Sequence, residues 1–136
     1  SLIHSFKGES EIARKYACEG VKLSQQFHSP FIEAVSYMRL GHAYQLPENQ
    51  NYKKARNSYF KALKLVDDLN IMRGRAEPLW GLSLLEAFNG RKVLGLKYGQ
   101  EGKEIAKKSG DIWLAGLLKI SLGINNYFAD QLADAE

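Results

Sequence analysis

The chain has 136 residues, of which 45% are hydrophobic and 25% are charged, and its 19 basic and 15 acidic residues give a net charge of +4. This composition is ordinary for a soluble globular protein and predicts a single domain, 1–136, with a buried core. A single cysteine excludes an internal disulfide, and no apolar run approaches the roughly 18 residues needed to span a bilayer, so we expect no membrane contact.

Apolar residues recur at spacings of three and four along the chain, and strand-like alternation is absent, which predicts an all-α fold. We expect helices at residues 9–27, 30–46, 51–68, 71–89, 91–108 and 112–128. The opening stretch SLIHSFKG matches the end of a preceding helix, and the closing stretch ADQLADAE matches the start of a following one.

The predicted helix starts are evenly spaced. Ser29 precedes Pro30, a hydroxyl N-cap followed by proline at the first helical position. Gly110 is typical of a helix end, and Asp111 after it is typical of an N-cap. Asn70 is a third candidate cap and lies midway between Ser29 and Asp111. A constant spacing of about 41 residues is typical of a helical repeat.

The stretch GRKVLGLKYGQEG raises the question of a phosphate-binding loop. Gly90 and Gly95 have the spacing of such a loop, but Lys97 comes one place late and no hydroxyl follows it. Shifting the helix at 91–108 back by 40 residues places Gly95 on Ala55 and Gly102 on Ala62, with Gly99 between them. We therefore interpret these glycines as close-packing positions inside a helix.

Two segments carry a family resemblance. YMRLGHAY, residues 37–44, and ARNSYFKA, residues 55–62, resemble the two helices of a tetratricopeptide repeat. The units here are longer than the usual 34 residues, and ALKLVDDLN and EIAKKSGD resemble segments of the sensor regions of MalT-like (LuxR-type) bacterial transcriptional regulators. The resemblance implies a right-handed α-solenoid of antiparallel helix hairpins, belonging to a larger, cytoplasmic, bacterial signalling or regulatory protein.

The resemblance also implies a non-catalytic function in protein binding or ligand sensing. The first helix of each tetratricopeptide unit lines a concave groove, which would take a protein, a peptide or a small-molecule effector. The polar residues on the corresponding sides of the predicted helices are Arg39, His42, Gln45, Arg75, Glu86, Lys119, Asn125 and Asn126. A solvated polar face is the alternative interpretation of each of them.

The last predicted helix is apolar almost all round. Together with the helix containing Trp80, it is interpreted as core between stacked repeats. Too little chain follows it to cover its outer face, so we expect a fragment of a longer array that self-associates there as a homo-oligomer. The residues of this C-terminal apolar face are Trp113, Leu117, Ile120, Ile124, Tyr127 and Phe128.

Two other functions stay open. The helices at 51–68 and 91–108 carry many lysines and arginines, so a nucleic-acid-binding solenoid is one alternative, although this partner is less expected than a protein. A structural oligomerisation module is the other. No catalytic constellation and no metal-ligand spacing is visible, so we expect no enzyme activity, no metal and no cofactor.

Overall fold

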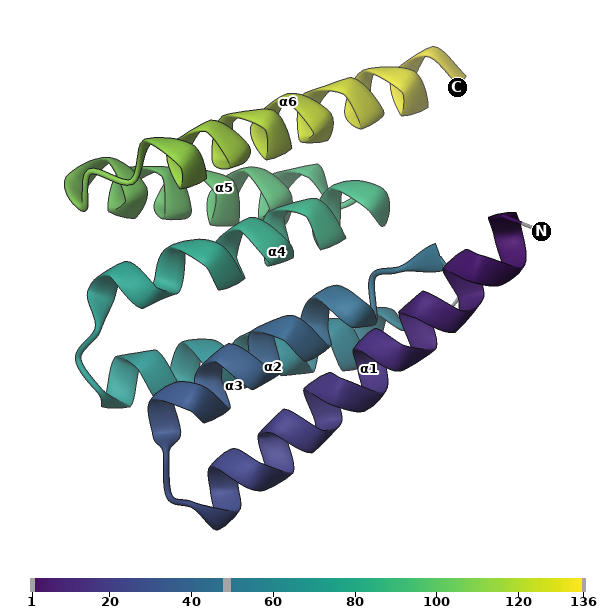
Figure 1. Ribbon diagram of the computed structural model, residues 1–136. Helices are drawn as coiled ribbons and strands as arrows, with labels where there is room; N and C mark the ends of the chain where they lie inside the picture. Colours follow the sequence, from purple (N-terminus) through teal and green to yellow (C-terminus); the bar gives the residue numbers. More distant parts are fainter. Residues whose placement is uncertain (1, 48–49, 136) are drawn as a thin grey trace. The chain divides into compact units, whose positions relative to one another are not determined.

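The computed structural model describes residues 2–47 and 50–135, and within these ranges all regular structure is helical (Figure 1). The helices are α1 (Leu2–Gln26), α2 (Pro30–Ala43), α3 (Tyr52–Asp68), the short 3₁₀ helix η2 (Met72–Arg75), α4 (Ala76–Phe88), α5 (Lys92–Lys108) and α6 (Ile112–Ala135). The predicted all-α fold is confirmed. None of the described helices is long and apolar enough to cross a membrane.

The helices group into two compact units, an N-terminal unit (Ser1–Asn70) and a C-terminal unit (Ile71–Glu136). In the N-terminal unit, α2 packs against α1 on one side and α3 on the other. In the C-terminal unit, α5 packs against both α4 and α6, α4 also contacts α6, and η2 contacts α4 and α5. The prediction of a single domain stays a prediction.

The first and last helices are longer than predicted. α1 runs through the expected boundary near residue 9, with Gly8 exposed inside it. α6 continues through residues 128–131, where a break was expected. Both predicted breaks are wrong, because neither segment contains a proline or a residue with the left-handed backbone that would end a helix.

The structure shows which side chains cap the starts of α2, α3 and α6. Asp111 is confirmed as the N-cap of α6, since its Oδ1 accepts the backbone N–H three residues later at 2.9 Å. Pro30 is the first residue of α2 as predicted, but the Ser29 side chain before it makes no capping hydrogen bond. The side chain of Asn51 caps α3, a role that the sequence analysis did not assign.

Asn70 ends a helix instead of starting one. It follows α3 with a positive φ of 56°, a left-handed conformation that asparagine tolerates better than most residues. His28 after α1 and Gly110 after α5 have the same conformation, with φ values of 51° and 72°. Asn70 therefore corresponds to Gly110 and not to Asp111, so the predicted capping role of Asn70 is wrong.

The mid-helix glycines of α5 are confirmed as packing positions. Gly95, Gly99 and Gly102 are all buried. A Cβ added at Gly99 would lie 2.7 Å from the Leu122 side chain of α6, and one at Gly102 would lie 2.8 Å from Leu118 of the same helix. Because real Cβ atoms do not approach so closely, only glycine lets α5 lie at this distance from α6.

Small residues bring helices together in the N-terminal unit as well. A Cβ added at Gly41 of α2 would lie 2.7 Å from the ring of Tyr59 in α3, which is completely buried. A Cβ added at Gly20 of α1 would lie 2.8 Å from the Ser36 hydroxyl of α2. The core of this unit is thus built around one large buried aromatic ring and close backbone contacts.

Candidate functional site

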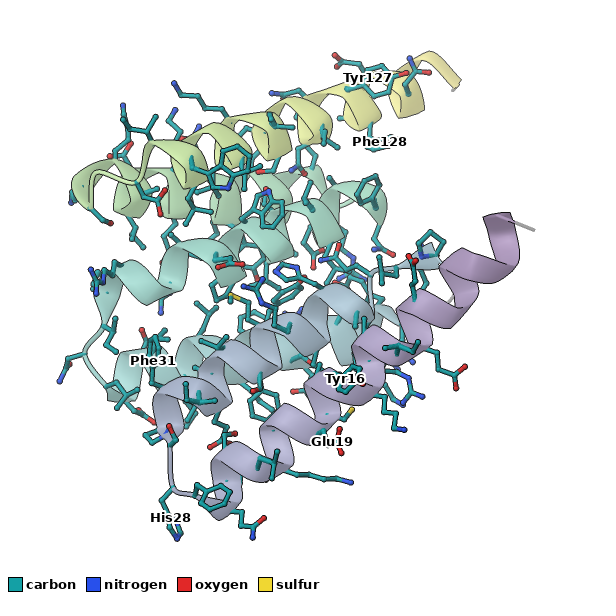
Figure 2. The ribbon with its side chains drawn as sticks, in the orientation of Figure 1. Tyr16, Glu19, His28, Phe31, Tyr127 and Phe128 are labelled. Atoms are coloured by element: carbon teal, nitrogen blue, oxygen red, sulfur yellow. The ribbon has the colours of Figure 1, made fainter. Side chains whose placement is uncertain are left out.

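A groove of about 470 Å³ opens between α1 and α2 in the N-terminal unit. Most of its wall is apolar, and Tyr16, labelled on α1 in Figure 2, is 67% exposed at its edge. The lining residues are Ala13, Tyr16, Ala17, Val35, Ser36, Arg39, His42, Ala43 and Leu46. Exposed apolar surface of this kind is typical of a binding groove.

The sequence of the two helices explains why the groove lies where it does. Gly20 and Ser36 hold α1 and α2 in close contact toward the turn that joins them. Farther from the turn, α1 presents the small side chains of Ala13 and Ala17, which leave space between the helices. Packing at one end therefore leaves an open, alanine-lined groove at the other.

Arg39 gives this groove a positive charge. It is exposed and lies on α2 among the lining residues. None of the described residues that line the groove is acidic. An arginine stays protonated at every physiological pH and can donate two parallel hydrogen bonds to a carboxylate. The groove is therefore suited to a ligand that is partly apolar and carries an anionic group.

His42 also lines the groove, and hydrogen bonds behind it fix its ring. Gln45 Nε2 donates to the Tyr59 hydroxyl at 2.6 Å, and the same hydroxyl is hydrogen-bonded to His42 Nδ1 at 2.7 Å. The His42 and Tyr59 rings also meet edge to face, with centroids 5.4 Å apart.

Gln45 has a different position from the one predicted. It is not among the residues that line the groove, and its side chain is bound to the Tyr59 hydroxyl. Its role in this structure is to orient the buried tyrosine, which in turn orients His42. Of the three residues predicted on this helix, the structure brings Arg39 and His42 to the groove and leaves Gln45 behind it.

The two candidates at the start of the C-terminal unit, Arg75 in η2 and Glu86 in α4, pair with residues on or just before α5. Arg75 donates to the Glu101 carboxylate of α5 at 2.9 Å and is largely buried. Glu86 is 0% exposed, and its Oε2 lies 3.9 Å from Nε of Arg91. The expectation that Glu86 offers its side chain to a partner is therefore wrong, because helix packing encloses it.

The three candidates on α6 separate into two exposed residues and one buried residue. Lys119 and Asn126 are exposed. Asn125 is 1% exposed, so its predicted place on a partner-binding surface is wrong. Its amide Nδ2 donates to the backbone oxygens of Ser121 at 2.9 Å and Ser83 at 3.2 Å, which ties α6 to α4. Backbone acceptors thus satisfy the buried Nδ2, whereas Oδ1 of the same amide is buried without a hydrogen-bond partner among the described residues.

The predicted apolar face of α6 is mostly open. Trp113, Ile120 and Tyr127 are 77%, 60% and 59% exposed, and Leu117 and Ile124 are half-buried. Trp113, interpreted as core between stacked repeats, is not covered by the described residues, as expected for a residue of the C-terminal apolar face.

Phe128 is wrongly assigned to this outer face. Its ring, labelled in Figure 2, meets Phe88 of α4 with centroids 5.5 Å apart, and the ring of the neighbouring Tyr127 with centroids 5.6 Å apart. Trp80, the other predicted core tryptophan, packs against the buried cluster of Ala76, Ala106 and Leu118.

The α1 side of the groove was missed in the sequence. Tyr16 and its neighbouring alanines belong to the predicted helix at residues 9–27, for which the sequence analysis named no partner-binding residue. An available signal was Tyr16 itself, a large aromatic residue beside lysine and arginine positions on an otherwise alanine-rich turn. Periodicity shows that such a residue lies on one face, but not whether another helix covers it.

The described residues include no group of three or more His, Cys, Asp or Glu side chains placed to hold a metal ion. Comparison of the chain with family models, with curated proteins and with solved structures gives no significant match. The tetratricopeptide resemblance therefore stays a prediction, and the groove itself has to indicate the function.

Proposed function

We propose that this chain is a non-catalytic binding module that holds a peptide segment in the groove between α1 and α2. One observation carries the proposal: the groove combines apolar walls with the permanent positive charge of Arg39, and none of its described lining residues is acidic. A binding function is also consistent with the hydrogen bonds that fix His42 in advance, because a pre-organised side chain loses little freedom when a ligand binds.

The expected ligand is a short peptide in which a bulky apolar side chain lies next to a carboxylate. A volume of about 470 Å³ is within the range of sites that hold small ligands. The side chain would lie against Tyr16 and the alanines of α1, and the carboxylate would accept hydrogen bonds from Arg39. The carboxylate can be a chain terminus or an acidic side chain, and the experiment below distinguishes them.

We further propose that the helix pairs form a right-handed tetratricopeptide-like solenoid within the regulatory part of a larger bacterial signalling protein. The contact between Gly41 and Tyr59 supports the architecture, because these residues occupy the small and aromatic positions of the motif. The longer units support the regulatory context through their resemblance to sensor regions.

The test is a titration of the protein with acetylated peptides that end in Leu, Phe or Met. The amide chemical shifts of the protein report where each peptide binds. One pool has free C-terminal carboxylates, a second has C-terminal amides, and a third has amidated ends with an internal Asp or Glu. We expect a carboxylate pool to shift signals of residues 13–17 and 35–46, and the amidated pool without acid to bind roughly 10-fold more weakly or worse. The pool that binds identifies the source of the carboxylate.

The matched variants are Arg39→Gln in the groove and Arg73→Gln in η2, an exposed arginine of the other unit. Arg39→Gln should reduce carboxylate binding to the level of the amidated pool, and Arg73→Gln should not change it. Equal binding of all three pools, or shifts confined to other residues, would refute the proposed groove.

A further inference from the structure

The outer side of α6 carries an uncovered helix-packing seam. Trp113, Leu117, Ile120, Ile124 and Tyr127 follow one another at alternating spacings of four and three residues. This alternation is the heptad pattern of helices that pair along their length. Trp113, Ile120 and Tyr127 share one heptad position and are 77%, 60% and 59% exposed. Leu117 and Ile124 share the other and are half-buried.

The packing of the C-terminal unit does not account for this seam. α5 lies against the opposite side of α6, where Leu118 and Leu122 face Gly102 and Gly99. Leu118 and Leu122 on that inner side are buried, whereas Trp113, Ile120 and Tyr127 of the seam are exposed. Exposed isoleucine, tryptophan and tyrosine in one continuous line indicate a surface for another helix.

Two glycines beside the seam also indicate that another helix packs here. Gly116 and Gly123 are seven residues apart, so they lie on one side of it. A Cβ added at either residue would meet no atom within 4 Å, unlike one at Gly99 or Gly102. The unit therefore does not need glycine there, although glycine weakens a helix. A bare backbone beside a seam lets a second helix approach closely.

We propose that a second copy of this chain covers the seam, with the two α6 helices packed antiparallel. Antiparallel packing places one heptad position opposite the other heptad position of the second copy. Leu117 then lies opposite Tyr127 of the second copy, and Ile120 lies opposite Ile124 of the second copy. The two-fold axis then passes beside Gly123, where the two backbones come closest. This surface lies in the C-terminal unit and does not depend on the proposed peptide groove.

Charge favours the antiparallel orientation. The end of α5, immediately before α6, is basic with the exposed Lys107 and Lys108. The other end of α6 carries the exposed, acidic Asp130. Antiparallel helices place the acidic end of one copy beside the basic corner of the other, whereas parallel helices would bring like charges together.

The dimer should be reversible. One helix pair is a small interface beside the roughly 1,600 Å² that stable complexes bury, so we expect dissociation constants on the order of micromolar. Sedimentation equilibrium over a concentration series measures this. Ile120→Glu should weaken association at least tenfold. Ile112→Glu should leave it unchanged, because Ile112 is on the same helix and 87% exposed but lies off the seam.

Helix content measured by circular dichroism checks that each variant folds, and Tyr127→Glu takes the place of Ile120→Glu if that variant loses helix. The orientation is tested in a Cys18→Ser background with a short bis-maleimide cross-linker. Gly123→Cys, beside the axis, should give covalent dimers, and Gly116→Cys should not, although both positions have room for a side chain.

Cross-linking of both cysteine variants at equal rates would indicate parallel helices and overturn the proposed orientation. A monomer at every concentration, or a dimer that Ile120→Glu and Tyr127→Glu both leave intact, would overturn the proposed interface.

Discussion

The side-chain oxygen Oδ1 of Asn125 occupies the space that a Cβ at Gly95 would need. Asn125 lies on α6 and Gly95 on α5, and the two helices meet along their length. The amide end of the same side chain binds the backbone of α4 and α6, while the Ser83 hydroxyl donates to the Gly95 carbonyl at 2.8 Å. The three helices of the C-terminal unit are thus joined at one buried point.

Gly95→Ala should destabilise the protein, because the added methyl group overlaps the Asn125 amide. The buried helices cannot move apart to make room without losing packing contacts. We expect a loss of about 1–3 kcal/mol in the free energy of unfolding, measured by urea denaturation. Gly116→Ala is the control, since its Cβ would meet nothing, and it should stabilise the helix by roughly 0.5–1 kcal/mol.

A double-mutant cycle with Asn125→Ala tests the cause of this loss. Removing the amide makes room for the methyl group, so the cost of Gly95→Ala should shrink in the Asn125→Ala background. Purely additive free energies would mean that the two residues do not compete for the same space.

Gly99→Leu should destabilise the protein as well, by roughly 1–3 kcal/mol or more. A Cβ at this position would already lie 2.7 Å from Leu122 and 2.9 Å from the Ser83 hydroxyl, and a leucine adds further atoms. Thermal unfolding compared with the wild-type chain is the measurement. A variant as stable as the wild type would show that α5 can move away from its neighbours without cost.

The sequence predicts the middle of this fold better than its ends or its site. Helix boundaries near Pro30 and Gly110 are local, since proline and a left-handed residue interrupt a helix wherever they occur. The burial of Asn125 is not local: Asn125 and Asn126 look alike in the sequence, but only Asn125 faces the space left by Gly95. Likewise, the groove depends on which face of α1 stays uncovered, and periodicity does not carry that information.

Alanine substitutions on α2 should distinguish Arg39, which serves binding alone, from His42, which also stabilises the fold. Arg39→Ala should leave the free energy of unfolding nearly unchanged, because the side chain is exposed. His42→Ala should cost about 1–3 kcal/mol, since it removes a hydrogen-bond partner of the buried Tyr59 hydroxyl. Both variants should weaken binding of the carboxylate peptides. Equal stability of the two variants would contradict the buried role of His42.

Tyr59→Phe should destabilise the N-terminal unit while keeping its packing. The ring stays over Gly41, but the hydroxyl that accepts from Gln45 and is hydrogen-bonded to His42 is lost. We expect a cost of about 1–3 kcal/mol in urea denaturation, because two buried polar groups lose a partner. Tyr127→Phe is the control, since that ring is exposed on α6 and its substitution should cost almost nothing.

The helix caps offer a comparison between two residues that look equivalent in the sequence. Asp111→Ala should destabilise by about 1 kcal/mol, because the Asp111 carboxylate accepts a backbone N–H at the start of α6 and carries a negative charge at the positive end of the helix. Ser29→Ala should cost much less, since the Ser29 side chain makes no capping bond and Pro30 already sets the first turn of α2. Urea denaturation of both variants at neutral pH measures the difference.

Raising the salt concentration should reduce the cost of Asp111→Ala only in part, because salt screens the charge but not the hydrogen bond. Equal costs for the two substitutions would mean that the Ser29 hydroxyl caps α2 in solution, and the two helix starts would then be equivalent after all.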